Sequence, residues 1–253
     1  KEDLHPEKRM TNIAPEILDK LRQYDTPTVL NVIELFEVHP RHEGFLNGEI
    51  KACFPEMAPI VGYASTATFQ SATEPVEGDA YSNLADQVGV FEEELPAPRI
   101  VVFEDIDPEP CGATFGEVMC TVYQNFGCVG LITSGGARDL DQVRALGFPC
   151  WASSVISSHA WCRIVDTHVP VKVGGCEIQP GELLHADCNG VAIVPALLAA
   201  EIALGCELLV EAEETVMGYA RSENPDVEGL KKAYQATKEA FSAIPAEVKR
   251  RLS

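Results

Sequence analysis

The chain has 253 residues, of which 46% are hydrophobic and 23% are charged, the composition of an ordinary soluble globular protein. Its 39 acidic and 19 basic residues give a net charge of -20, which repels phosphate backbones and anionic membrane surfaces. We therefore expect no nucleic-acid partner and no membrane partner, and one large domain with decorated ends.

The N-terminal part predicts a tail followed by two helices. Residues 1–15 are interpreted as the tail, and helical spacing begins at Glu16 in the segment ILDKLRQY. A second helix, VLNVIELFEV, follows Thr26-Pro27-Thr28, where Thr26 is a candidate cap and Pro27 is acceptable in the first turn. A helical hairpin is thus expected to open a domain that extends from residue 16 to residue 222.

A strand-helix-strand pattern occupies the centre. Residues 60–69 and 100–106 are interpreted as core strands, with a helix over 81–94 between them. A helix from about 116 to 126 and a strand at 129–133 follow. Right-handed crossover geometry would make the strands at 100–106 and 129–133 parallel neighbours.

The remaining third alternates short strands with helices. A short helix over 140–147 ends at Gly147, and a long helix begins at Pro195 and continues through Ala212 or further. The last segment, 223–253, is predicted as a C-terminal helical extension. Short strands are expected at 150–155, 163–173, 176–178, 183–186 and 191–194. The fold class that this order predicts is α/β.

The cysteines and the apolar segments indicate a reducing compartment. There is no C-x-x-C pair and no zinc-finger spacing, so the cysteines are interpreted as buried free thiols. No secretory segment and no run of eighteen apolar residues occurs, so a cytoplasmic location is expected. The nine cysteines are at positions 53, 111, 120, 128, 150, 162, 176, 188 and 206.

Three residues near the middle carry the strongest chemical signal. Twenty residues separate Glu117 from Arg138, and Asp139 follows at once. In the crossover geometry Glu117 lies in the first turn of a helix and Arg138-Asp139 follows the next strand, where ligands collect in α/β sheets. The sequence therefore predicts that all three groups share one pocket.

Each group suits a separate task on a 2-keto acid. The Arg138 guanidinium can hold a carboxylate or a developing enolate oxygen. Asp139 can ligate Mg2+ or Mn2+, with waters filling most of the coordination shell, and Glu117 can bind the metal through water and transfer a proton. The N–H groups of Val118 and Met119 at the helix start offer an anion site for the substrate carboxylate.

At these residues the sequence resembles the RraA-like family, in the branch of the 4-hydroxy-4-methyl-2-oxoglutarate aldolases, which also decarboxylate oxaloacetate. The signature of that branch, acidic-x20-Arg-Asp, is met by Glu117, Arg138 and Asp139. Supporting segments are PIVGYASTA at 59–67, GCVGLIT at 127–133, RALGFPCWA at 144–152 and VKVGGCEIQPGELLHADCNGVAIVP at 171–195. Ser134 departs from the Asp of many relatives, and the stretch 153–162 is unusual.

The resemblance implies a swivelling β/β/α sandwich and a class II pyruvate aldolase or oxaloacetate decarboxylase type of lyase. It also implies a homo-oligomer, either a trimer or a hexamer of two trimers, with sites at subunit boundaries. A metal ion on Asp139 and an Arg138 that contacts the pyruvoyl group are further implications. A Glu of a neighbouring subunit would complete the site, and the choice among Glu211, Glu213 and Glu214 stays open.

Two other functions remain alternatives. One is a non-catalytic regulator that binds an RNA-degradation enzyme, as some relatives bind ribonuclease E; those relatives lack the full acidic-x20-Arg-Asp set, so its retention here favours chemistry. The other is a lyase for a larger 2-keto acid, which the unusual stretch 153–162 suggests.

Several other polar or aromatic residues favour structural roles. His159 and Trp161 are interpreted as half-buried packing residues more than as pocket walls. Packing is also the preferred interpretation of Cys111. His168 and His185 are expected to form hydrogen bonds within strands. Asp187 is expected to brace the turn at Asn189-Gly190.

Overall fold

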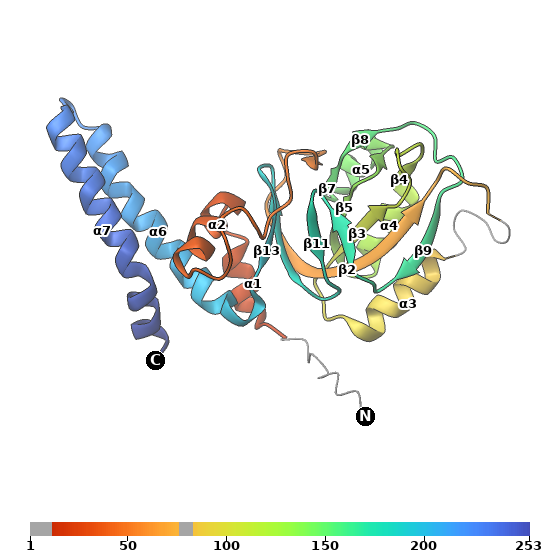
Figure 1. Cartoon of the computed structure of the whole chain (residues 1–253), viewed down its shortest axis with the longest axis horizontal. Coiled ribbons are helices and arrows are strands. Elements are labelled where there is room, and N and C mark those ends of the chain that lie inside the picture. The colour runs from red at the N-terminus through yellow and green to blue at the C-terminus, as the bar shows by residue number, and fades with distance from the viewer. Residues whose placement is uncertain (1–11, 76–82) are drawn as a thin grey trace.

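The computed structural model describes residues 12–75 and 83–253. It has a mixed α/β fold in which helices flank one large sheet (Figure 1). The described part of the sheet has eight strands in the order β1-β7-β5-β3-β2-β12-β13, with β9 paired to β2. Their bounds are β1 Lys51–Ala52, β2 Ile60–Gln70, β3 Arg99–Asp105, β5 Cys128–Thr133, β7 Cys150–Ala152, β9 Arg163–Thr167, β12 Leu183–Asp187 and β13 Gly190–Val194. Most of the predicted N-terminal tail lies outside the described residues.

The long strand β2 joins the two halves of this sheet. Along one edge it runs parallel to β3, from Tyr63↔Arg99 to Phe69↔Asp105. Along its other edge its first residues pair antiparallel with β12 and its last residues with β9. A β-bulge near Ala67 accompanies the curvature of β2 that Figure 1 shows.

Strand β3 explains why the central apolar run has no polar alternation. Its Val101 and Phe103 side chains pack toward the helices α3 (Leu84–Glu94), α4 (Glu117–Asn125) and α5 (Leu140–Leu146). Its Ile100 and Val102 side chains pack toward the opposite layer. That layer contains the hairpin of β10 (Val171–Val173) and β11 (Cys176–Ile178). Both faces of β3 are therefore buried, and β3 and β5 are parallel neighbours, as predicted.

The N-terminal helices α1 (Pro15–Leu21) and α2 (Thr26–Leu35) pack against the β12 side of the sheet. The predicted cap Thr26 is wrong, because Asp25 is the N-cap and its side chain accepts a hydrogen bond from Thr28 N–H at 2.8 Å. Thr26 is instead buried, with Oγ1 3.0 Å from His185 Nδ1 and its N–H donating to Asp187 at 3.0 Å. The prediction that Asp187 braces the next turn is confirmed by its bond from Asn189 N–H.

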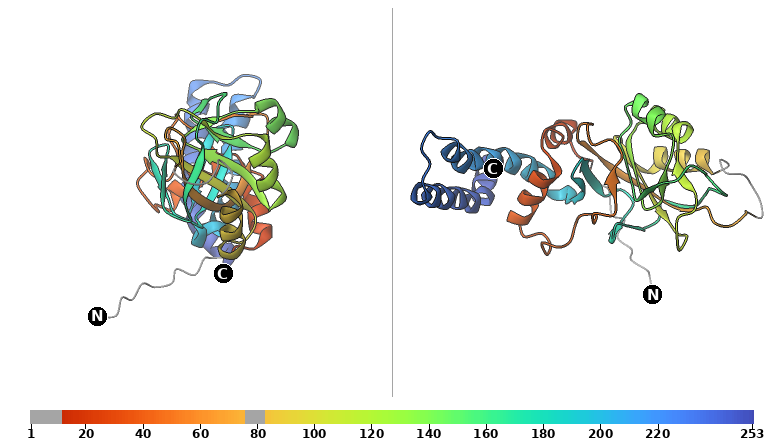
Figure 2. Two further views of the ribbon diagram at one scale, coloured as in Figure 1. Left: turned by 90° about the vertical axis from the view of Figure 1, so that its right-hand side faces the viewer. Right: turned by 90° about the horizontal axis from the view of Figure 1, so that it is seen from above.

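The C-terminal helices form a hairpin that projects from the sheet domain (Figures 1 and 2). A short 3-10 helix, η1 (Ala196–Leu198), leads into α6 (Ala199–Ala220), and α7 (Val227–Leu252) returns beside it. Ile244 and Val248 of α7 are buried with α1, α2 and α6 in one apolar cluster. The far end of the hairpin lies away from the sheet in Figure 1 and in the right-hand view of Figure 2.

Some local predictions were too coarse. The expected strand 150–155 is divided between β7 in the large sheet and β8 (Ser154–Val155) in a separate sheet, and 163–173 is divided into β9 and β10. His168 adopts a positive φ of 56° beyond the end of β9, so its assignment to a strand is wrong.

The thiols are free, but only five of the nine are buried. Cys111 and Cys188 are exposed and two others are intermediate, which corrects both the expectation of buried thiols and the packing role proposed for Cys111.

Candidate active site

A second, three-stranded parallel sheet brings the acidic-x20-Arg-Asp residues together. It consists of β4 (Ala113–Phe115), β6 (Gly136–Ala137) and β8. Parallel pairing of β4 with β6 places the ends of these strands at one edge. Helix α4 begins two residues after β4, and Arg138-Asp139 follows β6 directly. The start of α4 and the Arg-Asp pair therefore meet at that edge.

The Asp139 carboxylate contacts the start of α4. Its Oδ2 atom accepts a hydrogen bond from Glu117 N–H at 3.1 Å and lies 3.8 Å from Arg138 Nε. The N-cap of α4 is Gly116, which has no side chain to satisfy the free N–H groups. Asp139 supplies the missing acceptor, and the helix dipole favours its negative charge there.

Gly116 is required by this close approach. A Cβ atom at Gly116 would lie 2.5 Å from Asp139 Oδ2 and 3.1 Å from Arg138 Nε. Our sequence analysis did not single out Gly116, although its place directly before the acidic residue of the signature was a usable signal. The glycine provides the space in which Arg138 and Asp139 meet the start of α4.

The backbone of Asp139 is strained. Its φ of 54° and ψ of 38° lie in the left-handed region, which costs a residue with a side chain about 1 kcal/mol or more. The Val143 N–H donates to Asp139 O at 2.9 Å and fixes the following helix α5. This conformation turns the Asp139 side chain back toward α4, and strain of this kind is common at functional sites.

Arg138 is the cation of this site. Its side chain is 25% exposed, and its backbone N–H donates to Phe115 O at 3.3 Å. Burial raises the pKa of the Cys162 thiol, and the positive charge of Arg138 partly offsets that rise, so the guanidinium lies near Cys162. No hydrogen-bond partner within residues 12–75 and 83–253 occupies its side-chain nitrogens, so the fork is available to an anion.

The structure joins Glu117 to the site through its backbone. The Glu117 side chain is exposed, and its carboxylate has no hydrogen-bond partner in the described part of the chain. The first intrahelical bond of α4 runs from Cys120 N–H to Gly116 O. The N–H groups of Val118 and Met119 therefore precede the hydrogen-bonded ladder, as a helix N-terminal anion site requires.

The donors at Asp139 fit a hydrated hard cation. No group of three or more His, Cys, Asp or Glu side chains within the described ranges could enclose a metal ion. A caged zinc site is thus not formed by those residues. The contacts with Glu117 N–H and Arg138 Nε use Oδ2 of Asp139, which leaves Oδ1 for a metal ion. Mg2+ or Mn2+ commonly takes one or two carboxylates and completes its shell with water.

A partly buried carboxyl group lies beside the segment that leads to the Arg-Asp pair. Asp105 Oδ1 accepts the Asp107 N–H at 3.1 Å, but Oδ2 is buried without a hydrogen-bond partner among the described residues. Burial, the largest cause, raises the pKa of Asp105 to about 6, and the charge of Asp107 adds to the rise. A Cβ atom at Gly135 would lie 2.8 Å from Asp105 Oδ2, so this carboxyl supports the segment that leads to Arg138.

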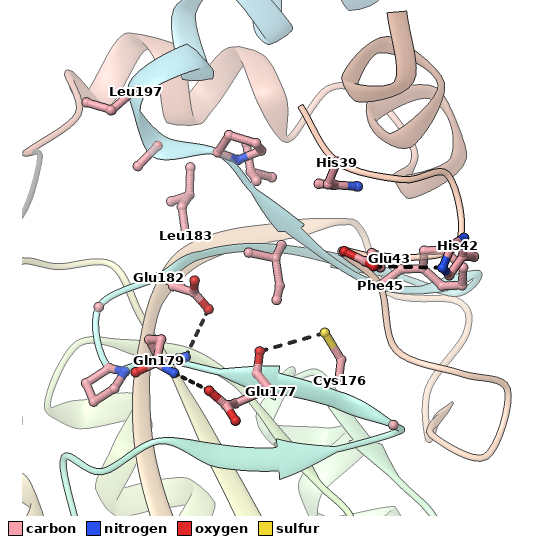
Figure 3. Close-up of a pocket in the computed structure, with 18 of the residues that line it drawn as sticks. His39, His42, Glu43, Phe45, Cys176, Glu177, Gln179, Glu182, Leu183 and Leu197 are labelled. Atoms are coloured by element: carbon pink, nitrogen blue, oxygen red, sulfur yellow. Dashed lines mark hydrogen bonds and ion pairs between the residues drawn. The ribbon is translucent and has the colours of Figure 1, made fainter. Parts of the chain in front are cut away.

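The large cavity of about 980 Å³ lies elsewhere (Figure 3). Its walls come from the segment after α2, the β10–β11 hairpin and the segment around η1, and none of the acidic-x20-Arg-Asp residues lines it. Its carboxylates are Glu43, Glu177 and Glu182, and none of the described residues that line it is a Lys or Arg. Size alone does not mark the place where Arg138 and Asp139 meet.

The comparisons with known proteins define the family. The family described as Aldolase/RraA, RraA-like, matches residues 15–193, and the chain belongs to this family. A protein of Halalkalibacterium halodurans named "Putative 4-hydroxy-4-methyl-2-oxoglutarate aldolase" is 28% identical over 137 residues, which cover 54% of this chain and 60% of that protein. The chain thus spans less than two thirds of that relative's length.

Solved structures support the fold. An uncharacterized protein from Pseudomonas syringae pv. tomato is 23% identical with a TM-score of 0.69, covering 89% of this chain and 96% of that one. RraAS2 of Streptomyces coelicolor, described as an unusual member of the RNase ES inhibitor RraA protein family, is 22% identical with a TM-score of 0.63, covering 84% and 99%. The RraA-like α/β fold predicted from the sequence is confirmed. None of the helices in the described ranges is long and apolar enough to cross a membrane.

Proposed function

We propose that this protein is a divalent-metal-dependent lyase that cleaves small 2-keto acids by retro-aldol reaction and also decarboxylates oxaloacetate. The observation that carries the proposal is the meeting of the Arg138 guanidinium, the Asp139 carboxylate and the N-terminus of α4 around Gly116. A cation, a metal-binding carboxylate and free N–H groups are what a substrate with adjacent carboxylate and ketone groups needs.

The substrate is held through its anionic end. The N–H groups of Val118 and Met119 receive the carboxylate, and the Arg138 fork binds the ketone oxygen, which becomes negative as the reaction proceeds. Because Arg138 is preorganised by Phe115 O and the neighbouring Asp139, its interaction with this oxygen strengthens as the charge develops.

Bond cleavage needs a proton acceptor. Glu117 takes the proton of the C4 hydroxyl group, directly or through water, while the C3–C4 bond breaks and its electron pair forms the enolate of pyruvate. Protonation of C3 then gives pyruvate. Loss of carbon dioxide from oxaloacetate leaves the same enolate, so one site serves both reactions.

Asp139 would hold the metal ion, and water would complete the coordination. Mg2+ or Mn2+, when bound, polarises the ketone and stabilises negative charge on its oxygen. The remaining lone pairs of Asp139 accept from Glu117 N–H, which keeps the carboxylate oriented.

The proposed assembly is a cytoplasmic homo-oligomer, a trimer or a hexamer, whose helix α6 lends a carboxylate to a neighbour. Glu214 pairs with Arg221 at 3.0 Å within its own chain. Burial, with a smaller contribution from Asp25, raises the pKa of Glu213. Glu211 is exposed, so Glu211 is the most available of the three for a partner.

The test is pyruvate release from oxaloacetate and from 4-hydroxy-4-methyl-2-oxoglutarate with Mg2+ or Mn2+ present. We expect Arg138→Ala to lower kcat/KM on the order of a thousandfold, as loss of a preorganised group at a developing oxyanion does. Arg138→Lys should recover only part of the loss, because an ammonium cannot form the planar fork.

The matched control is Arg144→Ala, which removes an exposed Arg of α5 that pairs with Glu56 and Asp141. Its kcat/KM should stay at the wild-type value. Undiminished turnover in Arg138→Ala would exclude the mechanism. If the wild-type protein releases no pyruvate with or without added metal and captures an RNA-degradation enzyme, the regulator is favoured instead.

A further inference from the structure

Three large apolar side chains are exposed on segments that adjoin the proposed site. Val118 is 60% exposed, Val155 is 66% exposed and Trp161 is 49% exposed. We call these three residues the apolar rim. Single exposed apolar residues are ordinary, but apolar residues that border one site are typical of a binding surface.

Two residues of the apolar rim belong to segments that carry the site. Val118 follows Glu117, whose N–H donates to Asp139. Val155 is the cross-strand partner of Ala137, the residue before Arg138, and the Ile156 N–H donates to Ala137 O at 2.9 Å.

The third residue, Trp161, is tied to the same region by its neighbours. It precedes Cys162, the thiol whose pKa responds to the charge of Arg138. The same loop is bonded to β4, since the Ala113 N–H donates to Ser158 O at 2.7 Å. Cys162 is also buried in one apolar cluster with Phe115 and Ala137, the residues that precede Gly116 and Arg138, so the loop of Trp161 packs against the segments that carry the site.

The charges of these segments limit the substrate. Within residues 105–120, 134–139 and 153–162 the only Lys or Arg is Arg138, against five acidic residues. The next cation along the chain, Arg163, donates to Gln70 Oε1 at 2.5 Å. In the proposed function the 2-keto acid end already occupies Arg138 and the N–H groups of Val118 and Met119, so a second carboxylate would meet acidic groups and apolar side chains.

We propose that the substrate carries an alkyl or aryl group at C4, and no carboxylate there, with this group packed on the apolar rim. The inference rests on the proposed function, because it names the substrate class of the same site. The reaction is the cleavage of R–CH(OH)–CH2–CO–COO⁻ to the aldehyde R–CHO and pyruvate. The hydroxyl proton leaves, the C3–C4 electron pair forms the enolate, and C3 takes up a proton.

The experiment compares two substrates of the same protein with Mn2+ present. One is 4-hydroxy-2-oxo-4-phenylbutanoate, and the other is 4-hydroxy-4-methyl-2-oxoglutarate, which bears a second carboxylate. Pyruvate release is measured for both. We expect kcat/KM to be at least about tenfold higher for the phenyl substrate, the scale on which an apolar pocket or an unpaired charge discriminates.

Variants of the apolar rim test which side chains cause the preference. Trp161→Ala should lower kcat/KM for the phenyl substrate about tenfold, mostly through KM, and Trp161→Phe should restore most of it. Val155→Lys should raise kcat/KM for the dicarboxylate several-fold, since it supplies a second cation beside Arg138. Val227→Ala and Val227→Lys are the controls, because Val227 is 70% exposed on α7, and neither should alter the preference.

The outcomes separate this inference from the function beneath it. Pyruvate from the dicarboxylate at an equal or higher rate would overturn the inference and leave the lyase standing. No pyruvate from either substrate would overturn both. If Trp161→Ala changes the mass of the protein in solution and leaves the substrate preference intact, the apolar rim is covered by a second copy of the chain, which also overturns the inference.

Discussion

The site at Arg138 and the cavity of Figure 3 hold their charged groups in different ways. At the site, opposite charges and a helix N-terminus meet around Gly116, and Asp139 has left-handed backbone. In the cavity, Glu182 accepts Gln179 N–H at 2.9 Å and Glu177 accepts the Gln179 side-chain N–H at 2.7 Å, so neutral donors satisfy two of its three carboxylates. The difference teaches that opposite charges meeting at a residue with left-handed backbone, and not cavity volume, are the stronger ground for proposing the site at Arg138.

Removing the charge of Asp139, the proposed metal ligand, should have the largest effect. We expect Asp139→Asn to lower kcat/KM on the order of a hundredfold to a thousandfold, because a neutral amide binds a divalent ion weakly. The amide oxygen can still accept the Glu117 N–H, so the melting temperature should change little. The measurement is kcat/KM as a function of Mn2+ concentration.

A nearby carboxylate provides the control for that variant. Asp141→Asn alters an exposed residue of α5 that pairs with Arg144, two positions from Asp139. Wild-type metal dependence is expected for Asp141→Asn. The same metal dependence in Asp139→Asn would place the metal elsewhere.

Filling the space at Gly116 with a side chain should have the next largest effect. An added Cβ atom must displace Asp139 Oδ2 from a distance of 2.5 Å, so Gly116→Ala should lower kcat/KM roughly tenfold to a hundredfold through misplacement of Arg138 and Asp139. Gly89→Ala in α3 is the matched control, since its Cβ would meet no atom within 4 Å. Equal activities of the two variants would show that the geometry around Gly116 does not matter.

The long elements were predictable because their patterns extend over many residues. The buried runs of β2 and β3, the crossover helix α4 and the parallel pairing of β3 with β5 followed from apolar periodicity and connection handedness. The proximity of Arg138 and Asp139 to the start of α4 followed from the same reasoning. Family resemblance supplied the layered fold.

The three strands of the second sheet were not predictable for a physical reason. Strands β4, β6 and β8 have two or three residues each, too few to show a period, and they exist because tertiary pairing holds them. The same holds for the positive φ of Asp139, which depends on the chain leaving β6 for α5. The need for a glycine at position 116, between the start of α4 and the Arg138-Asp139 pair, becomes visible only when α4 and β6 lie side by side.

The partly buried carboxyl group of Asp105 should have a weaker effect, on stability and not on turnover, and the direction of its pH dependence follows from its raised pKa. The folded-state pKa of Asp105 is about 6, above its unfolded value, mainly because burial penalises the charged form. Its contribution to the free energy of unfolding is therefore fully present below the unfolded pKa and lost as the pH rises through about 6. Asp105→Asn should remove this pH dependence.

The size of that effect is moderated by solvent, since Asp105 is only partly buried. We expect the wild type to lose about 1 kcal/mol relative to Asp105→Asn between pH 4 and pH 7, measured by urea unfolding at each pH. The reverse trend, with the wild type gaining stability against the variant as the pH rises, would mean that the charged carboxylate has a partner.

The smallest effect is expected in the cavity. Glu182→Gln keeps an oxygen that can accept the Gln179 N–H, so kcat/KM and the melting temperature should both stay close to wild type, within about twofold for the rate. A loss comparable with that of Gly116→Ala would mean that the cavity takes part in turnover. The hydrogen bonding of Glu182 to a neutral donor and the pairing of Asp139 with Arg138 would then no longer distinguish the cavity from the proposed site.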